Sequence, residues 1–381
     1  MRGSKKAAGR RRNAWAVAQV TLTVLVAGLV LFSLCGCGKD SGAGGNTRVV
    51  TDMGGRTVKI PQVIGKVFCS NPIGTVDLYM LAPELLAGWN FKPAGVDATF
   101  IAKRYLNLPS LGVWMGAGAT PNVEEIRAVA PDVILCFWTV DDTGVRMADA
   151  IQKESGLPVV LLDYNISSSD KTFAFLGDLL GEKKRSEELA SYCREKLDEI
   201  SRSVASVPEA ERKTLFLAEG KGGLQTDPVG SLHVQDTFDL LGVKNVVDLP
   251  GTEGKGMGMP SVSLEQVIAW QPDVVLVSEY SMSDSQKSNL YDEIRKDGGW
   301  QNLKAVQAGR VYRIPQSPFS WIGRPPSAAR ILGCLWLAKI LYPDTTTIDL
   351  KQEMKNFYGL FYRYELTDQE IQSILEDSGV Q

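Results

Sequence analysis

The fold of this chain is decided by two stretches that repeat one pattern. They are Val123-Glu-Glu-Ile-Arg-Ala-Val-Ala-Pro-Asp-Val-Ile-Leu135 and Leu264-Glu-Gln-Val-Ile-Ala-Trp-Gln-Pro-Asp-Val-Val-Leu276. Each is typical of a short helix, a Pro-Asp turn and a strand that is buried on both faces. Strands of this kind between helices predict a parallel sheet covered on both sides. The repetition therefore predicts two similar α/β lobes, although the pattern is common enough to recur by chance.

Other short apolar runs extend this prediction. The further strand candidates are Lys66–Ser70, Leu85–Trp89, Val159–Asp163, Leu215–Glu219 and Val311–Ile314. Between the two halves, apolar residues recur at helical spacing from residue 171 to 207. Gly177 and Gly181 leave open whether this segment is one long helix or two helices in series. We expect an N-terminal lobe over residues 48–168, a linking helix over 169–207 and a C-terminal lobe over 208–381, with modest lobe closure because a helical link resists bending.

The N-terminus has the layout of a secretory signal peptide. The first 36 residues contain six basic residues and no acidic one, and an apolar run extends from Ala14 to Leu34. The run is also long enough for an uncleaved membrane anchor. Leu34-Cys35-Gly36-Cys37 resembles the bacterial lipobox, which favours cleavage before Cys37 and acylation of that cysteine. Residues 37–47 are polar and glycine-rich, as in a flexible tether. The route of export, general or twin-arginine, stays open.

Composition argues against several function classes. Without residues 1–36 the chain keeps 35 basic and 44 acidic residues, a net charge of −9, which argues against nucleic acid as a partner. The single histidine, His233, and scattered cysteines cannot assemble a typical zinc, manganese or nickel site. Neither a nucleophile elbow nor a P-loop occurs, so the catalytic case is thin. We expect Cys69 and Cys136, which stand in apolar runs, to be buried free thiols, and we expect no disulfide framework and no covalently bound cofactor.

A ligand site is predicted at the carboxyl ends of the strands. In open parallel sheets, ligands bind in the crevice outside these ends. The candidate ligand-binding residues follow the predicted strands or lie in adjoining loops: Asn71, Trp114, Trp138, Tyr164, His233, Tyr280, Trp321 and Arg324. Large aromatic faces with one guanidinium suit a bulky, partly aromatic or macrocyclic ligand that carries anionic oxygens. The alternative for each aromatic residue is ordinary core packing, and for His233 it is a structural hydrogen bond in a loop.

The order of several motifs resembles a known family, the substrate-binding lipoproteins of ABC importers for iron-siderophore, haem and cobalamin. The resemblance begins at about residue 47. It rests on Thr51-Asp-Met-Gly-Gly-Arg-Thr-Val-Lys-Ile-Pro61, the two Pro-Asp stretches, Gly309-Arg-Val-Tyr-Arg-Ile-Pro315, Arg324-Pro-Pro-Ser327, Leu335-Trp-Leu-Ala-Lys-Ile-Leu-Tyr-Pro343 and the tail that begins at Phe357. It implies the class III periplasmic-binding-protein fold, in which a long helix joins two Rossmann-like lobes.

The resemblance also implies how the chain works. One glutamate per lobe would dock into the permease, and these map onto Glu124 and Glu265, which the repeat aligns 141 residues apart. The alternative is that both acids only interact with a helix N-terminus. The implied protein is a lipid-anchored monomer outside the cytoplasm that delivers a ferric, siderophore-like iron complex to an ABC permease dimer and its ATPase. Haem, cobalamin or another metal complex stays open as the ligand, and so does coordination of a bound metal by His233. A ligand-presenting sensor or a lipid-anchored enzyme would be a different class.

Overall fold

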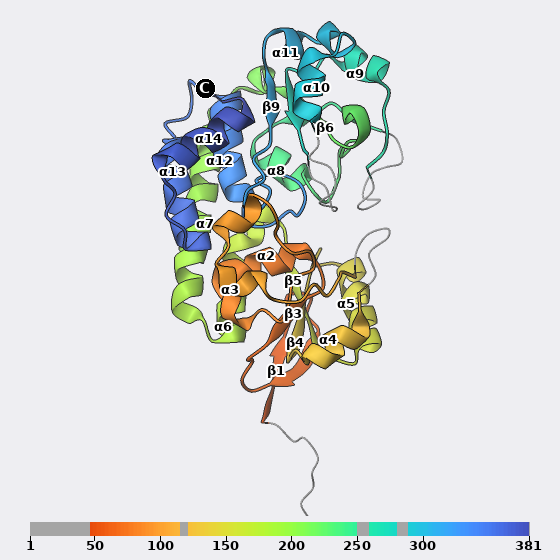
Figure 1. The fold of residues 1–381 in the computed structure, drawn as a ribbon, viewed down its shortest axis with the longest axis vertical. Helices are drawn as coiled ribbons and strands as arrows, with labels where there is room; N and C mark the ends of the chain where they lie inside the picture. The colour runs from red at the N-terminus through yellow and green to blue at the C-terminus, as the bar shows by residue number, and fades with distance from the viewer. Residues whose placement is uncertain (1–45, 115–120, 250–258, 280–288, 381) are drawn as a thin grey trace, which may run out of the picture. The chain divides into compact units, whose positions relative to one another are not determined.

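Two parallel sheets form the centres of two α/β lobes in the computed structural model, which describes residues 46–114, 121–249, 259–279 and 289–380 (Figure 1). The first sheet has the strand order β3-β4-β5 and the second has the order β7-β6-β8-β9. Their bounds are β3 (Val67–Cys69), β4 (Val133–Trp138), β5 (Val159–Asp163), β6 (Thr214–Ala218), β7 (Lys244–Asn245), β8 (Val274–Val277) and β9 (Val311–Arg313). Every residue of β4 and β8 is buried, as their continuous apolar sequences predict.

The repeated stretches adopt the same structure in both lobes. Helix α4 (Val123–Val129) follows the capping residue Asn122, and α9 (Leu264–Trp270) follows the capping residue Ser263. Both helices end at a residue with positive φ, 53° at Ala130 and 45° at Gln271. A left-handed residue is a common helix terminator, and it turns the chain toward the next strand.

The Pro-Asp turns hold neighbouring strands together at their starts. The Asp132 carboxylate accepts the backbone N–H groups of Gly65 and Lys66, just before β3, at 2.7 and 2.8 Å. The Asp273 carboxylate accepts the N–H of Thr214, the first residue of β6, at 2.9 Å. In return, the N–H of Asp132 donates to Lys66 O and that of Asp273 to Thr214 O. Each aspartate therefore satisfies strand-start amides that have no partner in the ladder.

The predicted linking helix is two helices in series, α6 (Ser169–Leu180) and α7 (Lys183–Ala205). Gly181 ends α6 with a φ of 83°. The helices pack closely beside this turn, because a Cβ at Gly177 would lie 1.8 Å from Ser186 Oγ. Helix α7 then packs against α2 of the first lobe and against α8 and α12 of the second, and Figure 1 shows it spanning both lobes.

The remaining helices cover the sheets and form the C-terminal region. They are α2 (Pro72–Leu81), α3 (Lys103–Leu106), α5 (Asp142–Ser155), α8 (Gln235–Leu240), α10 (Leu290–Lys296), α11 (Lys304–Gln307), α12 (Arg330–Leu341), α13 (Leu350–Phe357) and α14 (Asp368–Ser378). Helix α12 is buried on nearly every side and contacts α7 and α13. A helix that is apolar all round belongs in the interior, so α12 forms the centre of the core beside the link.

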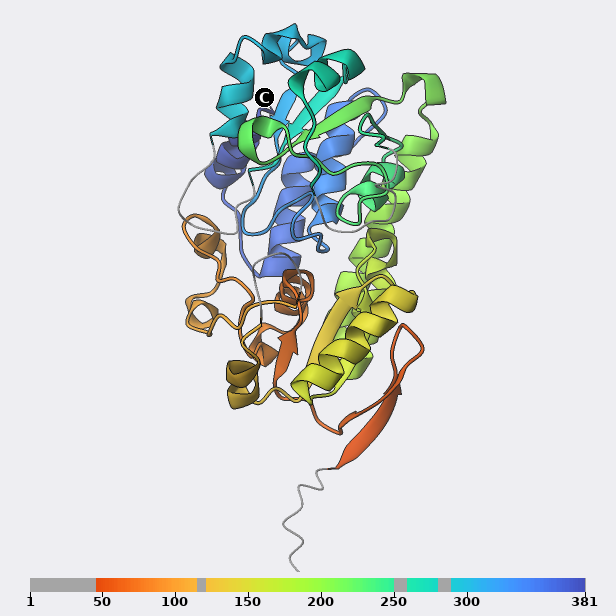
Figure 2. The ribbon, with the colours of Figure 1, turned by 90° about the vertical axis from the view of Figure 1, so that its right-hand side faces the viewer.

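An antiparallel hairpin of β1 (Thr47–Thr51) and β2 (Thr57–Pro61) begins the described chain. Figure 2 shows it at the end of the first lobe that faces away from the second lobe. The Arg56 guanidinium binds Asp52 at 2.9 Å and Asp149 of α5 at 2.8 Å. Asp52 in turn accepts the N–H of Leu161 in β5. The hairpin is therefore attached to the first lobe by polar contacts that its sequence alone did not indicate.

One predicted strand, Leu85–Trp89, is not a strand. A 3-10 turn over Pro83–Leu85 is followed by isolated parallel bridges from Leu86 to Val67 and from Trp89 to Ser110. Gly88 lies so close to the backbone of Pro109 that a Cβ would approach its carbonyl oxygen to 2.8 Å. The segment thus runs beside β3 but pairs with two different neighbours, and no continuous ladder forms.

Four cysteines lie in the described part of the chain, whereas the predicted N-terminal export signal does not. Cys69, Cys136, Cys193 and Cys334 are buried with free thiols. Within the described ranges, no helix has the length and apolar character that crossing a bilayer requires. The predicted signal peptide, Cys37 and most of the tether lie outside the described residues.

Candidate functional site

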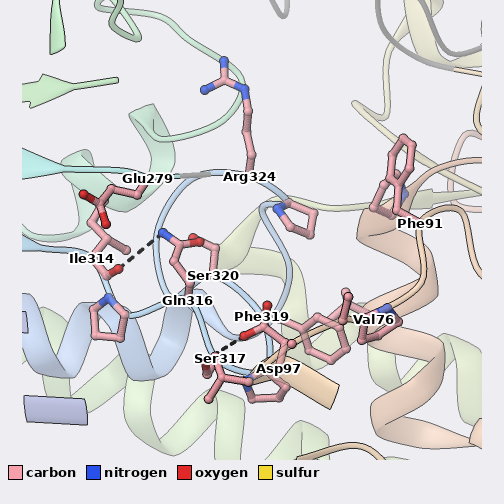
Figure 3. Close-up of a pocket in the computed structure, with 18 of the residues that line it drawn as sticks. Val76, Phe91, Asp97, Glu279, Ile314, Gln316, Ser317, Phe319, Ser320 and Arg324 are labelled. Atoms are coloured by element: carbon pink, nitrogen blue, oxygen red, sulfur yellow. Dashed lines mark hydrogen bonds between the residues drawn. The ribbon is translucent and has the colours of Figure 1, made fainter. Parts of the chain in front are cut away.

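A cleft of about 950 Å³ lies between segments of the two lobes (Figure 3). The first lobe contributes the start of α2 and the loop 89–97, and the second contributes Arg313 and the loop 314–320. The C-terminal helix α14 supplies the remaining wall through Ile374, Asp377 and Ser378. The second-lobe wall follows β9, so that part of the cleft obeys the strand-end rule for parallel sheets.

Buried amide side chains fix the first-lobe wall. The Asn71 side chain accepts the N–H of Gly74 and donates to Phe137 O at 2.7 Å, which holds the start of α2 against β4. Asn90 donates to Cys69 O and Gly112 O at 2.9 and 2.8 Å. Both side chains are almost fully buried, so satisfying their hydrogen bonds fixes the local geometry. Next to this frame, Val76 and the half-exposed Phe91 line the cleft.

The loop after β9 forms the opposite wall and contacts the first lobe. The Ser317 hydroxyl donates to Asp97 at 2.7 Å, and Gln316 donates to Ile314 O at 3.3 Å (Figure 3). The Phe319 ring lies 6.4 Å from the Trp89 ring, which is itself 1% exposed. The wall therefore combines aromatic and proline surfaces with a few polar groups, which is the usual composition of a small-molecule pocket.

The charged side chains around the cleft are mostly paired. Arg313 lies 3.0 Å from Glu279 and over the Tyr291 ring at 4.7 Å. Burial raises the pKa of Glu279, although the N–H of Tyr291 and the charge of Arg313 oppose this. Lys92 is exposed at the first-lobe wall. The cleft thus has no large excess of either charge among its described residues.

Arg324 belongs to a buried charge cluster at the edge of the cleft. Its guanidinium binds Glu219 at 3.0 Å and Asp227 at 2.8 Å, and its Nη2 lies 3.0 Å from His233 Nδ1. Figure 3 shows the Arg324 side chain pointing away from Val76 and Phe319, toward the second lobe. Burial lowers the pKa of His233, although the nearby Asp227 carboxylate opposes this.

The two carboxylates of this cluster differ in their affinity for a proton. Burial and the neighbouring Asp227 raise the pKa of Glu219 to about 8, against the effect of Arg324. Burial also opposes the ionisation of Asp227, but His233, Arg324 and the Ser231 hydroxyl outweigh it and lower the pKa of Asp227. One guanidinium between two close carboxylates explains this division, because a single cation stabilises one anion better than two.

Comparison with known proteins identifies the family that has this architecture. The family model for periplasmic binding proteins matches residues 91–318. The chain belongs to this family. A solved ABC transporter solute-binding protein from Sulfurospirillum deleyianum is 30% identical, with 86% of this chain and 99% of that chain covered and a TM-score of 0.76. The family membership and this similarity make the chain a solute-binding protein of the ABC transporter type that acts outside the cytoplasm.

Two named relatives are more distant. The molybdate-binding protein MolA of Haemophilus influenzae is 24% identical over 83% of this chain and 91% of its own length. The heme uptake protein IsdE of Staphylococcus aureus is 21% identical over 90% of this chain and 97% of its own length. A solved structure of MolA has a TM-score of 0.64 at 21% identity, which shows a shared fold alone.

The structure of this binding protein brings four of the predicted ligand residues together. Trp138, Tyr164 and His233 line one narrow gap, and Arg324 joins them through His233. The Tyr164 hydroxyl donates across this gap to Leu232 O at 2.8 Å. Of these four, Arg324 also lines the larger cleft.

Three others lie in structural positions. Asn71 caps α2, Trp114 donates to Glu154 of α5 at 2.8 Å, and Trp321 is fully buried with its ring 6.5 Å from that of Trp336. None of the three is among the residues that line the described cleft. Tyr280 lies outside the described residues.

Sequence reasoning missed most of the lining residues. The half-exposed ones with the largest side chains are Phe91, Arg313 and Gln316. Arg313 and Gln316 stand at and just after the end of β9, so the strand-end rule could have found them. Phe91 gave no such signal, because it follows an isolated bridge instead of a strand.

The raised pKa of Glu219 predicts a specific pH dependence of stability. In the folded protein Glu219 keeps its proton up to about pH 8, whereas in the unfolded chain it loses the proton near pH 4.5. The contribution of this group to the unfolding free energy is therefore fully present below pH 4.5 and is lost as the pH rises through 8. Glu219→Gln has no proton to lose. Between pH 5 and 8 it should therefore lose less unfolding free energy than the wild type does, by up to about 1.4 kcal/mol per pH unit.

Urea denaturation of both proteins at pH 5, 6.5 and 8 measures this difference. Glu125→Gln, on the exposed side of α4, serves as the control and should follow the wild type. Parallel stability curves for Glu219→Gln and the wild type would show that Glu219 is ionised in the folded protein throughout this range.

Proposed function

We propose that this protein captures a bulky metal chelate, in the first place a ferric siderophore-like complex, and delivers it to an ABC permease. The observation that carries this proposal is the cleft of about 950 Å³ between the lobes. That volume is at the upper end of the range for small-molecule sites, about 300–1,000 Å³. A single oxyanion such as molybdate would fill little of it. The volume thus favours a solute nearer in size to the heme named for IsdE than to the molybdate named for MolA.

The walls of the cleft suit a metal that arrives with its own ligands. The one histidine of the chain is engaged with Arg324, and Arg324 is engaged with two carboxylates. Neither is therefore the first choice for contacting a solute in this conformation. Phe91 and Phe319 offer flat apolar surface, while Lys92 and Gln316 offer donors for oxygen atoms on the rim of a chelate.

Titration of the protein with candidate solutes tests the ligand class. Ferric hydroxamate, ferric catecholate, ferric citrate, haem, cobalamin and molybdate would each be added while tryptophan fluorescence is followed. We expect quenching by at least one chelate, because Trp89 lines the cleft. Phe91→Ala should weaken the affinity for that chelate about two- to tenfold, because a lost aromatic contact costs about 0.5 to 1.5 kcal/mol.

The control for this substitution is Phe175→Ala, since Phe175 is half-buried on α6 and is not among the residues that line the cleft. It should leave the affinity unchanged. Saturable binding of molybdate with no response to any chelate would overturn the proposed ligand class.

We infer that Glu124 and Glu265 dock the protein onto its permease. They occupy the same position in two equivalent helices, each exposed in the first turn. The backbone N–H of Glu265 lowers the pKa of its own carboxyl group, which keeps a negative charge at that surface. Two matched acids on the two lobes suit a partner with two similar subunits, because complementary charges fix the register of an encounter.

Replacing both glutamates by alanine should leave chelate affinity intact and reduce uptake by cells at least tenfold. Glu125→Ala with Gln266→Ala is the matched control, because these residues follow the two glutamates directly and are also exposed. Normal uptake by the Glu124→Ala, Glu265→Ala variant would refute docking through these residues. Normal chelate binding in cells that show no uptake even with the wild-type protein would instead favour a ligand-presenting sensor.

We further propose that a lipid on Cys37 anchors the mature protein to the membrane surface. The Cys35-Gly36-Cys37 sequence and the following polar tether support this assignment. Cys37→Ser should move the protein from the membrane fraction to the soluble fraction, because acyl chains provide the anchoring energy. Cys35→Ser is the control and should leave it in the membrane fraction. Membrane retention of Cys37→Ser would indicate an uncleaved apolar anchor instead.

A further inference from the structure

The C-terminal segment Leu350–Val380, named here the strap, lies outside the part of the chain that the family model matches. It consists of α13, a π-helical turn over Tyr358–Tyr362 and α14. Its last helix nevertheless supplies a wall of the cleft, through Ile374, Asp377 and Ser378. The strap is therefore placed to affect what enters and leaves the cleft.

The middle of the strap is bound firmly to the first lobe. The Arg363 guanidinium donates to the carbonyl oxygens of Tyr79, Met80 and Leu81 at 3.3, 3.1 and 2.8 Å. These are the last carbonyls of α2, which have no partner within the helix. Arg363 also has a φ of 56°, which ends the π-helical turn and directs the chain toward α14. The Tyr364 ring packs edge-on against Phe100 with the ring centroids 5.1 Å apart.

The strap also contacts the second lobe, where Tyr358 donates to Ser317 O and the Tyr362 ring lies 5.8 Å from that of Phe319, but its C-terminal helix α14 has weaker polar contacts there. The Arg313 guanidinium donates to Asp377 O at 3.4 Å, which is long for a hydrogen bond. Beyond α14, Gly379 has a φ of 82° and packs so closely that a Cβ would lie 2.4 Å from Tyr291 Oη. The first-lobe attachment thus has three charge-assisted hydrogen bonds. Helix α14 itself adds to the second lobe only one long hydrogen bond, apolar packing against β9 and the glycine contact.

We propose that the strap is a second tie between the lobes, which limits their separation and the rate at which a solute leaves the cleft. The α6–α7 link joins the lobes through the chain, and the strap joins them again where it lines the cleft. Because α14 is held by weaker polar contacts than Arg363 is, the strap opens there, by release of α14 from Tyr291. The statement about solute release rests on the proposed function, whereas the statement about lobe separation does not.

The experiment uses the chain from Asn46 to Gln381, which forms one compact unit. Gly379→Ala places a methyl group against the Tyr291 hydroxyl and imposes a positive φ on alanine. It should raise the exchange rate of the backbone amides of Leu375–Ser378 about tenfold or more. Tyr291→Phe alone should change little, and the double variant should recover part of the protection, because the obstructing oxygen is gone. Gly359→Ala is the matched control, because nothing lies within 4 Å of its added Cβ.

Lobe separation is measured in the same proteins without any solute. Spin labels on Glu125→Cys and Gln266→Cys would report the interlobe distance, and the four native cysteines between Asn46 and Gln381 are buried. We expect a broader distance distribution in Gly379→Ala and in a chain that ends at Thr367, which lacks α14. An unchanged distribution in the chain that ends at Thr367 would overturn the proposal, whatever the protein binds.

The release of a bound solute is the second measurement. For whichever chelate binds, the dissociation rate should rise about tenfold in Gly379→Ala and should recover partly in the double variant. If no chelate binds, the proposed function fails while the distance measurement still decides about the strap. A broader distance distribution with an unchanged dissociation rate would overturn the part of the proposal that concerns release.

Discussion

The carboxylates of Asp132 and Asp273 align the two sheets on which the rest of the molecule is built. A parallel strand begins with amide groups that its neighbour cannot reach, and burial makes an unsatisfied amide costly. Each aspartate follows a proline and precedes a buried strand, and it binds the amides at the start of the adjacent strand. With the starts aligned, strands of similar length also end level, as β6, β8 and β9 do at Ala218, Val277 and Arg313. The loops that leave those ends can then meet at one edge of each sheet.

The charges near the cleft limit what the protein can bind. A buried arginine needs a compensating anion, and Arg324 has the Asp227 carboxylate, with the Glu219 carboxyl group and His233 beside it. Because its guanidinium is already paired, Arg324 stabilises the fold and is not free to bind an anionic solute in this conformation. The half-exposed aromatic and amide groups on the opposite walls are left to contact a solute. Under the proposed function, shape and hydrogen bonds to the oxygen atoms of a chelate therefore carry more of the recognition than net charge does.

Much of the fold could be predicted from local sequence, because it depends on local rules. The repeated helix, turn and strand, the α6–α7 link and the buried cysteines follow from periodicity and from uninterrupted apolar runs. The strand Leu85–Trp89 was predicted wrongly because its apolar residues pair with two different neighbours. Nothing in a single segment reveals how many neighbours that segment will have.

The site was predicted less completely for a related reason. Trp138, Tyr164, His233 and Arg324 lie together, as expected for residues that follow predicted strands or stand in the loops beyond them, but of these only Arg324 lines the cleft. The partners of Arg324, however, are 105 and 97 residues away and gave no sign of pairing. Trp321 lies under α12, whose Gly333 is close enough that a Cβ would meet Trp321 O at 1.9 Å. The direction in which a proline-rich loop folds is decided by such packing and cannot be read from its composition.

The buried thiols link the folded state of this protein to its chemical durability. Burial raises the pKa of Cys69, Cys136 and Cys334, so little thiolate is available for oxidation or exchange. An exported chain spends its life in surroundings that promote disulfides. While it stays folded, these sulfur atoms are inert. Once it unfolds, the same atoms become reactive and can cross-link in wrong pairs, so a brief loss of structure outside the cytoplasm can become permanent.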